Sequence, residues 1–204
     1  MQPLPSTVEH MEAFEQFVAV ALREEGFVVS EAVKFPVARQ VRKDRIEVQT
    51  HGYEVDLVGA RADRLVLATV KSFFGSRGVQ ESDVTGTGGN AGLYRLLNDP
   101  VIRNGVVKCA ANLYRYTEEQ VFLRLYVGKF LRHKDGTDDR EAITRWCETT
   151  KAGGGVIEVF GVDDVVAKAR LVAVRKSYIN DPVIVAMKVL AAAGVLDLRE
   201  TPLP

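Results

Sequence analysis

Near the start of the chain, apolar residues recur every three or four positions. They form one stripe of a helix: Val8, Met11, Phe14, Val18, Ala21 and Leu22. Such a stripe is typical of a helix that packs one side against a core. Ser6 and Glu9 have the spacing of a capping box, and Gly26 suits the position that follows a helix. The pattern therefore predicts a helix that starts at Ser6 and ends before Gly26.

Strand-like patterns follow this helix. Residues 27–41 are extended and partly apolar in character, and three further runs have strand patterns: residues 45–49, 53–59 and 64–73. His51-Gly52 and the polar residues 60–64 separate these runs, and both segments are short enough to turn hairpins. We therefore expect a three-stranded antiparallel unit directly after the first helix.

Helical and strand patterns alternate through the rest of the chain. Strands are expected at residues 121–131 and 156–161, and helices at residues 91–97, 138–151, 163–176 and 181–193. The pentapeptide NDPVI occurs twice, at residues 98–102 and 180–184. Asp as N-cap followed by Pro starts a helix well, so the repeat indicates shared capping rather than a repeated domain. The whole order predicts an α/β fold.

Composition and charge narrow the class of protein. The chain has 204 residues, which fits one domain and is short for two of usual size. Its 27 basic and 27 acidic residues cancel, so any nucleic-acid binding must come from a local patch. The two cysteines lack metal-site spacing and are expected to be free thiols. Because no segment has the pattern of a membrane span or a signal peptide, we expect a cytoplasmic protein with no membrane partner.

Two neighbouring predicted strands carry polar groups that suit phosphodiester chemistry. Alternate residues of a strand point to the same side, so Glu54 and Asp56 share one face, as do Thr69 and Lys71. A carboxylate pair can hold Mg²⁺, which prefers oxygen ligands, and a lysine can steady developing negative charge. The simplest alternative is a structural ion pair between Asp56 and Lys71 that has no catalytic role.

The run EVDLVGARADRLVLATVKS, residues 54–72, resembles the active-site hairpin of the PD-(D/E)XK nuclease superfamily. The resemblance implies a restriction-endonuclease-like core, with a mixed central sheet flanked by helices and extra C-terminal helices. That core would occupy about residues 6–161 of a single domain, and the helical addition about residues 162–204.

The same resemblance implies roles for individual residues. Asp56 is expected to be a metal ligand, the main-chain carbonyl of Val70 a second ligand, and Lys71 the catalytic lysine. Mg²⁺ or Mn²⁺ is the implied cofactor. No nucleotide cofactor is expected, because the Gly-rich residues 86–92 lack the Lys-Ser/Thr of a phosphate-binding loop.

The first helix extends the resemblance. The spacing of Glu15, Leu22 and Gly26 is similar to that in the opening helix of resolvase-like and restriction-endonuclease-like members, where a helical Glu can reach the metal. Glu15 borders the apolar stripe on a helical wheel, so it is the expected helical metal ligand.

Thr69 departs from the family pattern, in which its position is acidic. A neutral hydroxyl is a weak Mg²⁺ ligand, so the site lacks one negative charge. Glu54 and Glu15 are the candidates to supply that charge, and Thr69 is a candidate to hold a metal-bound water by hydrogen bonding.

A basic segment supplies the candidate nucleic-acid surface. Its members are Lys34, Arg39, Arg42, Lys43 and Arg45, with Arg77 added after the catalytic strand. A solvated basic hairpin is an equally good interpretation, because Asp44 and Glu47 dilute the charge. DNA is the expected partner, and nucleases that cut both strands often act as homodimers.

Two functions of different classes fit these features. The first is a metal-dependent endonuclease or resolvase-like enzyme, a hydrolase of phosphodiester bonds in DNA with a variant active site. The second is a catalytically inactive module of the same fold that binds nucleic acid or protein, its site having decayed at Thr69. Cleavage of DNA in the presence of Mg²⁺ or Mn²⁺ separates them.

Overall fold

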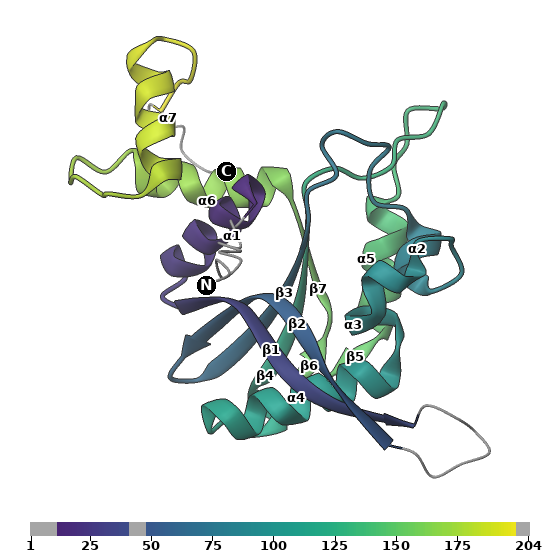
Figure 1. Cartoon of the computed structure of the whole chain (residues 1–204). Helices are drawn as coiled ribbons and strands as arrows, with labels where there is room; N and C mark the ends of the chain where they lie inside the picture. The colour runs from purple at the N-terminus through teal and green to yellow at the C-terminus, as the bar shows by residue number, and fades with distance from the viewer. Residues whose placement is uncertain (1–11, 41–47, 199–204) are drawn as a thin grey trace, which may run out of the picture.

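A five-stranded mixed sheet forms the centre of the molecule, with the strand order β1-β2-β3-β4-β7 (Figure 1). The computed structural model describes residues 12–40 and 48–198. The strands of this sheet are β1 (Val28–Gln40), β2 (Val48–Arg61), β3 (Arg64–Lys71), β4 (Val121–Val127) and β7 (Glu158–Gly161). The first three are antiparallel neighbours, whereas β4 runs parallel to β3 and β7 runs parallel to β4. The predicted α/β class with a mixed central sheet is confirmed.

The first helix, α1 (Ala13–Glu24), is shorter than the sequence predicts. Glu12 has an extended backbone, with φ −60° and ψ 147°, so the expected start at Ser6 is wrong for this helix. The Ser6 and Glu9 capping box lies outside the described residues. The end agrees with the prediction, because Gly26 has a φ of 85°, a conformation that glycine adopts at little cost.

One long strand replaces two predicted ones. β2 runs unbroken through His51 and Gly52, which pair with Val37 and Pro36 of β1. The predicted turn at His51-Gly52 is therefore wrong, because β1 offers a hydrogen-bonding partner along this whole stretch. The turn between Arg61 and Arg64 lies where it was expected. The three-stranded antiparallel unit is thus confirmed, but β1, β2 and β3 form it.

Helices cover both faces of the sheet (Figure 1). On one face α1 packs beside α6 (Val162–Ala173); on the other lie α3 (Arg95–Asn98), α4 (Pro100–Tyr114) and α5 (Arg140–Thr149). Alternate residues of β3 serve the two cores. Val66 and Ala68 pack in the cluster with α1, whereas Leu65 and Leu67 pack in the cluster with α4. Burial on both faces explains why β3 has an almost unbroken apolar sequence.

The NDPVI repeat starts two helices, as predicted. Asp99 Oδ1 accepts hydrogen bonds from Val101 N and Ile102 N at 3.0 and 3.3 Å at the start of α4. Asp181 repeats this arrangement at the start of α7 (Pro182–Ala192), with distances of 3.0 and 3.4 Å. Each carboxylate satisfies N–H groups that the first helical turn leaves without partners.

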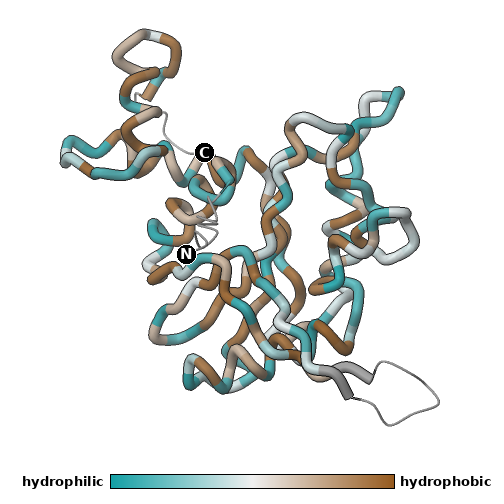
Figure 2. The backbone as a smooth tube through the Cα atoms, in the orientation of Figure 1, coloured by the Kyte–Doolittle hydropathy of each residue, from teal (hydrophilic) through white to brown (hydrophobic). Residues whose placement is uncertain are grey.

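Smaller elements fill the remaining connections. They are α2 (Glu81–Thr85), two 3₁₀ turns (Ala91–Tyr94 and Glu118–Gln120), and the hairpin of β5 (Lys151–Ala152) with β6 (Gly155–Val156). Figure 2 shows apolar residues along much of α7, and Val189 on this helix is 61% exposed. Within the described residues, every helix is too short or too polar to cross a membrane.

Candidate functional site

Asp56 lies where β2 and β3 separate. The backbone pairing of the two strands extends from Arg61 and Arg64 as far as Leu57 and Ala68. Beyond this point the side chain of Asp56 replaces a backbone partner: its Oδ2 accepts a hydrogen bond from Val70 N at 2.6 Å. Thr69 Oγ1 donates to the same oxygen at 3.1 Å. The carboxylate is therefore held in a fixed position at the open end of the hairpin.

A backbone distortion in β1 lies opposite this carboxylate. Ala32 has a φ of 49°, unusual for a residue with a Cβ, and it interrupts the pairing between Glu31↔Leu57 and Val33↔Val55. Leu57 packs in the α1 cluster, whereas Val55, two residues earlier, packs in the α4 cluster. The side chains of β2 therefore change from one face of the sheet to the other around Asp56. Alanine carries no sequence signal for such a distortion, so the sequence did not predict it.

Lys71 is the cationic member of the site. Its Nζ lies 4.0 Å from Asp56 Oδ2, and the two side chains are only 20% and 22% exposed. Two residues further on, Phe73 has a φ of 48°. Strained backbone of this kind often clusters at functional sites; here Ala32 lies opposite Asp56 in the strand register, and Phe73 follows Lys71 by two residues.

Glu15 approaches the pair from α1. Burial raises the pKa of its carboxyl, and the negative charge of Asp56 raises it further, while Lys71 acts in the opposite direction. The N–H of Glu12 donates to Glu15 Oε2 at 3.2 Å, which fixes the side chain at the start of the helix. The Asp56 carboxylate is thus close enough to affect Glu15, and the role of Glu15 as a metal ligand stays a prediction.

Glu12 and Ser72 form a contact that the sequence did not predict. Ser72 Oγ donates to Glu12 Oε2 at 2.8 Å, joining the residue before α1 to the residue after Lys71. This hydrogen bond ties the start of the helix to the end of β3. The contact crosses sixty positions of sequence, so no local pattern could have revealed it.

Glu54 does not join the group formed by Asp56 and Glu15. Its carboxylate lies 3.1 Å from Lys34 Nζ on β1, and both side chains are largely exposed. This pairing does not support the expectation that Glu54 and Asp56 act on one surface, which stays a prediction. That expectation assumed a regular strand, whereas the distortion opposite Asp56 changes the direction of the side chains between residues 54 and 57.

The donor set is compatible with Mg²⁺ but smaller than expected. Within residues 12–40 and 48–198, no three or more His, Cys, Asp and Glu side chains form a group that could hold a metal ion. Two neighbouring carboxylates, Asp56 and Glu15, remain, and Mg²⁺ in proteins is often held by one or two carboxylates plus waters. The N–H and C=O of one strand residue point to the same side, so the Val70 carbonyl faces the Asp56 side.

The residues that the sequence predicts to bind nucleic acid lie in different parts of the structure. Lys34 is paired with Glu54, and Arg39 lies near the end of β1. Arg42, Lys43 and Arg45 lie outside the described residues. Arg77 is exposed in the segment that follows β3, and its side chain has no hydrogen-bond or ion-pair partner among the described residues.

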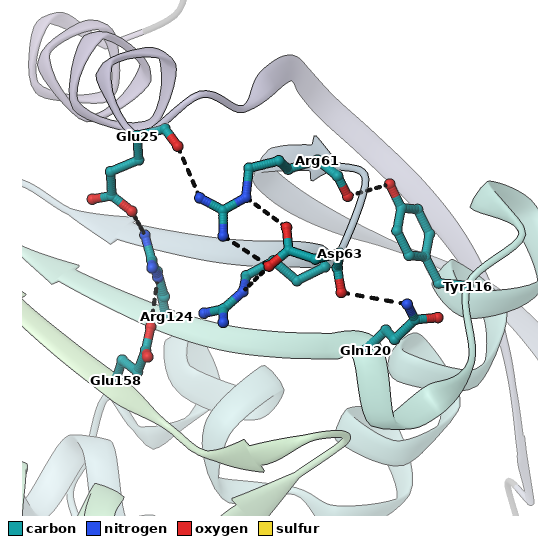
Figure 3. Close-up of polar contacts among 8 residues, drawn as sticks. Glu25, Arg61, Asp63, Tyr116, Gln120, Arg124 and Glu158 are labelled. Carbon is teal, nitrogen blue, oxygen red and sulfur yellow. Dashed lines mark hydrogen bonds and ion pairs between the residues drawn. The ribbon is translucent and has the colours of Figure 1, made fainter.

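A second polar cluster lies on the α1 face of the sheet and has a structural role (Figure 3). Arg124, only 7% exposed, donates to Glu158 Oε2 at 2.6 Å and to Glu25 Oε2 at 2.8 Å. It also donates to the hydroxyl of Tyr126, whose pKa burial raises to about 12. The cluster links the end of α1 to β4 and β7.

Comparison of the chain with protein-family models, with curated proteins and with solved structures gives no match. The chemistry of the site must therefore be argued from its own geometry.

Proposed function

We propose that the protein is a metal-dependent endonuclease that hydrolyses phosphodiester bonds in DNA, with an active site of the PD-(D/E)XK type in which Thr69 stands at the usual acidic position. The observation that carries the proposal is the convergence of Asp56, Lys71 and Glu15 at the point where β2 and β3 separate. Partial burial of acidic and basic groups lowers the stability of the fold unless the groups pair with each other or bind a ligand.

The arrangement of elements supports the proposal. Helix α1 precedes three antiparallel strands, and helix α4 then leads to β4, which is parallel to β3. The PD-(D/E)XK superfamily, which residues 54–72 resemble, has a core of the same order: a helix, three strands, a helix and a strand. The hairpin of β2 and β3 holds Asp56 and Lys71 together at its open end, with both side chains partly exposed.

Each residue has a chemical task in this proposal. Asp56, Glu15 and the Val70 carbonyl would hold Mg²⁺, and the partly buried, like-charged pair of carboxylates provides a reason for a cation to bind there. When bound, Mg²⁺ would polarise the phosphoryl oxygen and lower the pKa of a water. Lys71 orients the attacking water and stabilises the charge that develops on the phosphate. Thr69 and Val70 N–H hold Asp56 in position.

A second candidate function is a nucleic-acid-binding module of the same fold without catalysis. The observation that favours it is the small donor set, since Asp56 Oδ2 already accepts two hydrogen bonds and no third acid joins the site within the described residues. The two functions share the fold and differ in metal-dependent turnover.

A plasmid-nicking assay with Mg²⁺ or Mn²⁺ tests the proposal. We expect the wild type to cleave, and Asp56→Asn and Lys71→Met each to lower the rate by about 10²-fold or more, since each removes a group that acts on the transition state. Lys108→Met is the matched control for Lys71→Met, because Lys108 is exposed on α4. Glu54→Gln should also keep its activity, because its carboxylate is paired with Lys34.

The outcomes separate the candidates. Cleavage that is lost with Asp56→Asn and kept with Lys108→Met supports the enzyme. Absence of cleavage by the wild type with either metal, together with binding of the same DNA, supports the inactive module instead. Equal activity of the wild type and Asp56→Asn would point to a contaminating nuclease.

A further inference from the structure

The segments that follow β3 and β4 pair with each other beyond the sheet. Gly128 N donates to Lys71 O at 2.9 Å, Val79 N to Lys129 O at 2.8 Å, and Leu131 N to Val79 O at 2.8 Å. Figure 1 shows both segments extending together past the ends of β3 and β4. We call residues 76–79 and 129–134 the basic ribbon.

Tight packing fixes the shape of the basic ribbon. Gly78 has a φ of 103°, and a Cβ at this position would lie 2.6 Å from the backbone of Phe130. A side chain is therefore excluded on both conformational and steric grounds. Lys129 Nζ donates to Ser76 O at 2.6 Å and joins the two segments again. The ribbon is thus an extension of the sheet with a defined geometry.

Three cations of the ribbon make no ion pair within the described residues. Arg77, Arg132 and Lys134 are exposed, and their side chains make no hydrogen bond or ion pair with any residue that the structure describes. Such charges are available to a partner. Because the net charge of the chain is zero, a local group of this kind is what a polyanion would need.

Acidic neighbours on the same loop are already engaged. Asp135 Oδ1 accepts from Thr137 N and Oγ1 at 3.0 and 2.7 Å, and Asp138 Oδ1 accepts from Arg140 N at 3.0 Å. Asp139 accepts from Glu81 N at 2.8 Å and lies 2.6 Å from His133 Nε2. These hydrogen bonds stabilise the loop, and none of them joins a carboxylate to Arg77, Arg132 or Lys134.

We infer that the basic ribbon binds the phosphate backbone of DNA beside the Asp56 and Lys71 site. The inference rests on the proposed function, because the first segment of the ribbon follows β3, which carries Lys71, and Gly128, just before the second segment, donates to the Lys71 carbonyl. Exposed Arg and Lys side chains bind phosphates without reading bases and position a duplex. The basic ribbon thus positions the polynucleotide, and Asp56 and Lys71 act on its phosphodiester bond.

The test is DNA binding by a triple variant, Arg77→Ser with Arg132→Ser and Lys134→Ser. A matched control replaces Lys108, Lys151 and Lys168 by Ser, since these lysines are equally exposed but lie on α4, β5 and α6. Anisotropy of a labelled duplex is measured in EDTA over a range of NaCl concentrations. Both variants carry the same change in net charge, so only the position of the lost charges differs.

We expect the ribbon variant to bind at least about 10-fold more weakly at low salt than the control variant. Each lost phosphate contact lowers the slope of log K against log salt by about 0.9, so the slope should fall by roughly 2 to 3. Equal binding by the two triple variants, or no binding by the wild type at low salt, would overturn the inference.

The outcomes for the ribbon and for the nuclease are separable. Ribbon-dependent binding without cleavage by the wild type supports the ribbon and contradicts the enzyme. Cleavage by the wild type with unchanged binding of the ribbon variant supports the enzyme and contradicts the ribbon.

Discussion

At the scale of single residues, Thr69 decides how many negative charges the candidate site carries. Its hydroxyl donates to Asp56 Oδ2, and the residue is only 7% exposed. An acid at this position would add a third carboxylate to the neighbourhood of Asp56 and Glu15. Threonine therefore supplies a hydrogen-bond donor that stabilises the Asp56 carboxylate in the absence of a cation.

Thr69→Glu should make the folded state depend on divalent metal. In EDTA the added carboxylate is expected to lower the free energy of unfolding by about 1–3 kcal/mol, because it is poorly solvated and close to Asp56. Mg²⁺ should restore this loss, and thermal unfolding with and without Mg²⁺ measures it. Thr69→Val is the control, since it removes the donor without adding charge. An equal response of both variants to Mg²⁺ would contradict the prediction.

Glu15→Gln tests the electrostatic coupling within the site. The pKa of the Glu15 carboxyl is raised, so the folded chain binds its proton more tightly than the unfolded chain. The contribution of Glu15 to stability is therefore complete at low pH and is lost as the pH rises through the folded pKa. The variant should be more stable than the wild type at pH 7, in the absence of metal.

The same comparison at low pH provides the check. Below the ordinary carboxyl pKa of 4.5 the Glu15 carboxyl is protonated and therefore neutral, like the amide of the Gln variant. The difference in the free energy of unfolding between the variant and the wild type should therefore disappear. Urea unfolding at several pH values measures it. A difference that stays constant with pH would show that packing, rather than charge, is responsible.

At the scale of elements, two identical pentapeptides start helices in different surroundings. The helix α4 that follows Asp99 lies against the sheet, whereas α7, which follows Asp181, packs on α6. Asp181 also lies 3.4 Å from Arg23 Nη1, which links α7 to α1. Local sequence therefore determines the helix start, and the tertiary structure determines what each helix contacts.

Removing either cap should weaken the protein by a similar amount. Asp99→Ala and Asp181→Ala are each expected to lower the free energy of unfolding by about 1 kcal/mol, measured by urea denaturation. Asn is also a good N-cap, so Asp181→Asn separates the cap from the ion pair with Arg23 and should recover most of the loss. A failure of Asn to recover it would assign the effect to the ion pair.

At the scale of the whole molecule, Arg124 joins parts that are distant in sequence. It lies on β4 and binds Glu25 at the end of α1 and Glu158 on β7 (Figure 3). Arg124→Met should lower the free energy of unfolding by about 2–4 kcal/mol, because it leaves two partly buried carboxylates without their partner. The triple change with Glu25→Gln and Glu158→Gln should recover part of the loss. Urea denaturation measures both, and no loss for Arg124→Met would contradict the structural role.

Much of the fold could be predicted from local patterns. The apolar periodicity of α1, the alternation in β4 and the Asp-Pro pairs before α4 and α7 each depend on a few neighbouring residues. The predictions were wrong where pairing with a segment distant in sequence outweighed the local sequence pattern. His51-Gly52 has the composition of a turn, but its pairing with β1 keeps it extended.

For the candidate site, the sequence by itself determined the chemical groups, and the tertiary structure decided which of them meet. The short hairpin between β2 and β3 brings Asp56 and Lys71 together, because register follows from a two-residue turn. The distortion at Ala32, the approach of Glu15, the separation of Glu54 and the pairing of the basic ribbon all depend on contacts between remote segments. Such contacts leave no periodic trace in the sequence, because they are set by how the packed layers fit together.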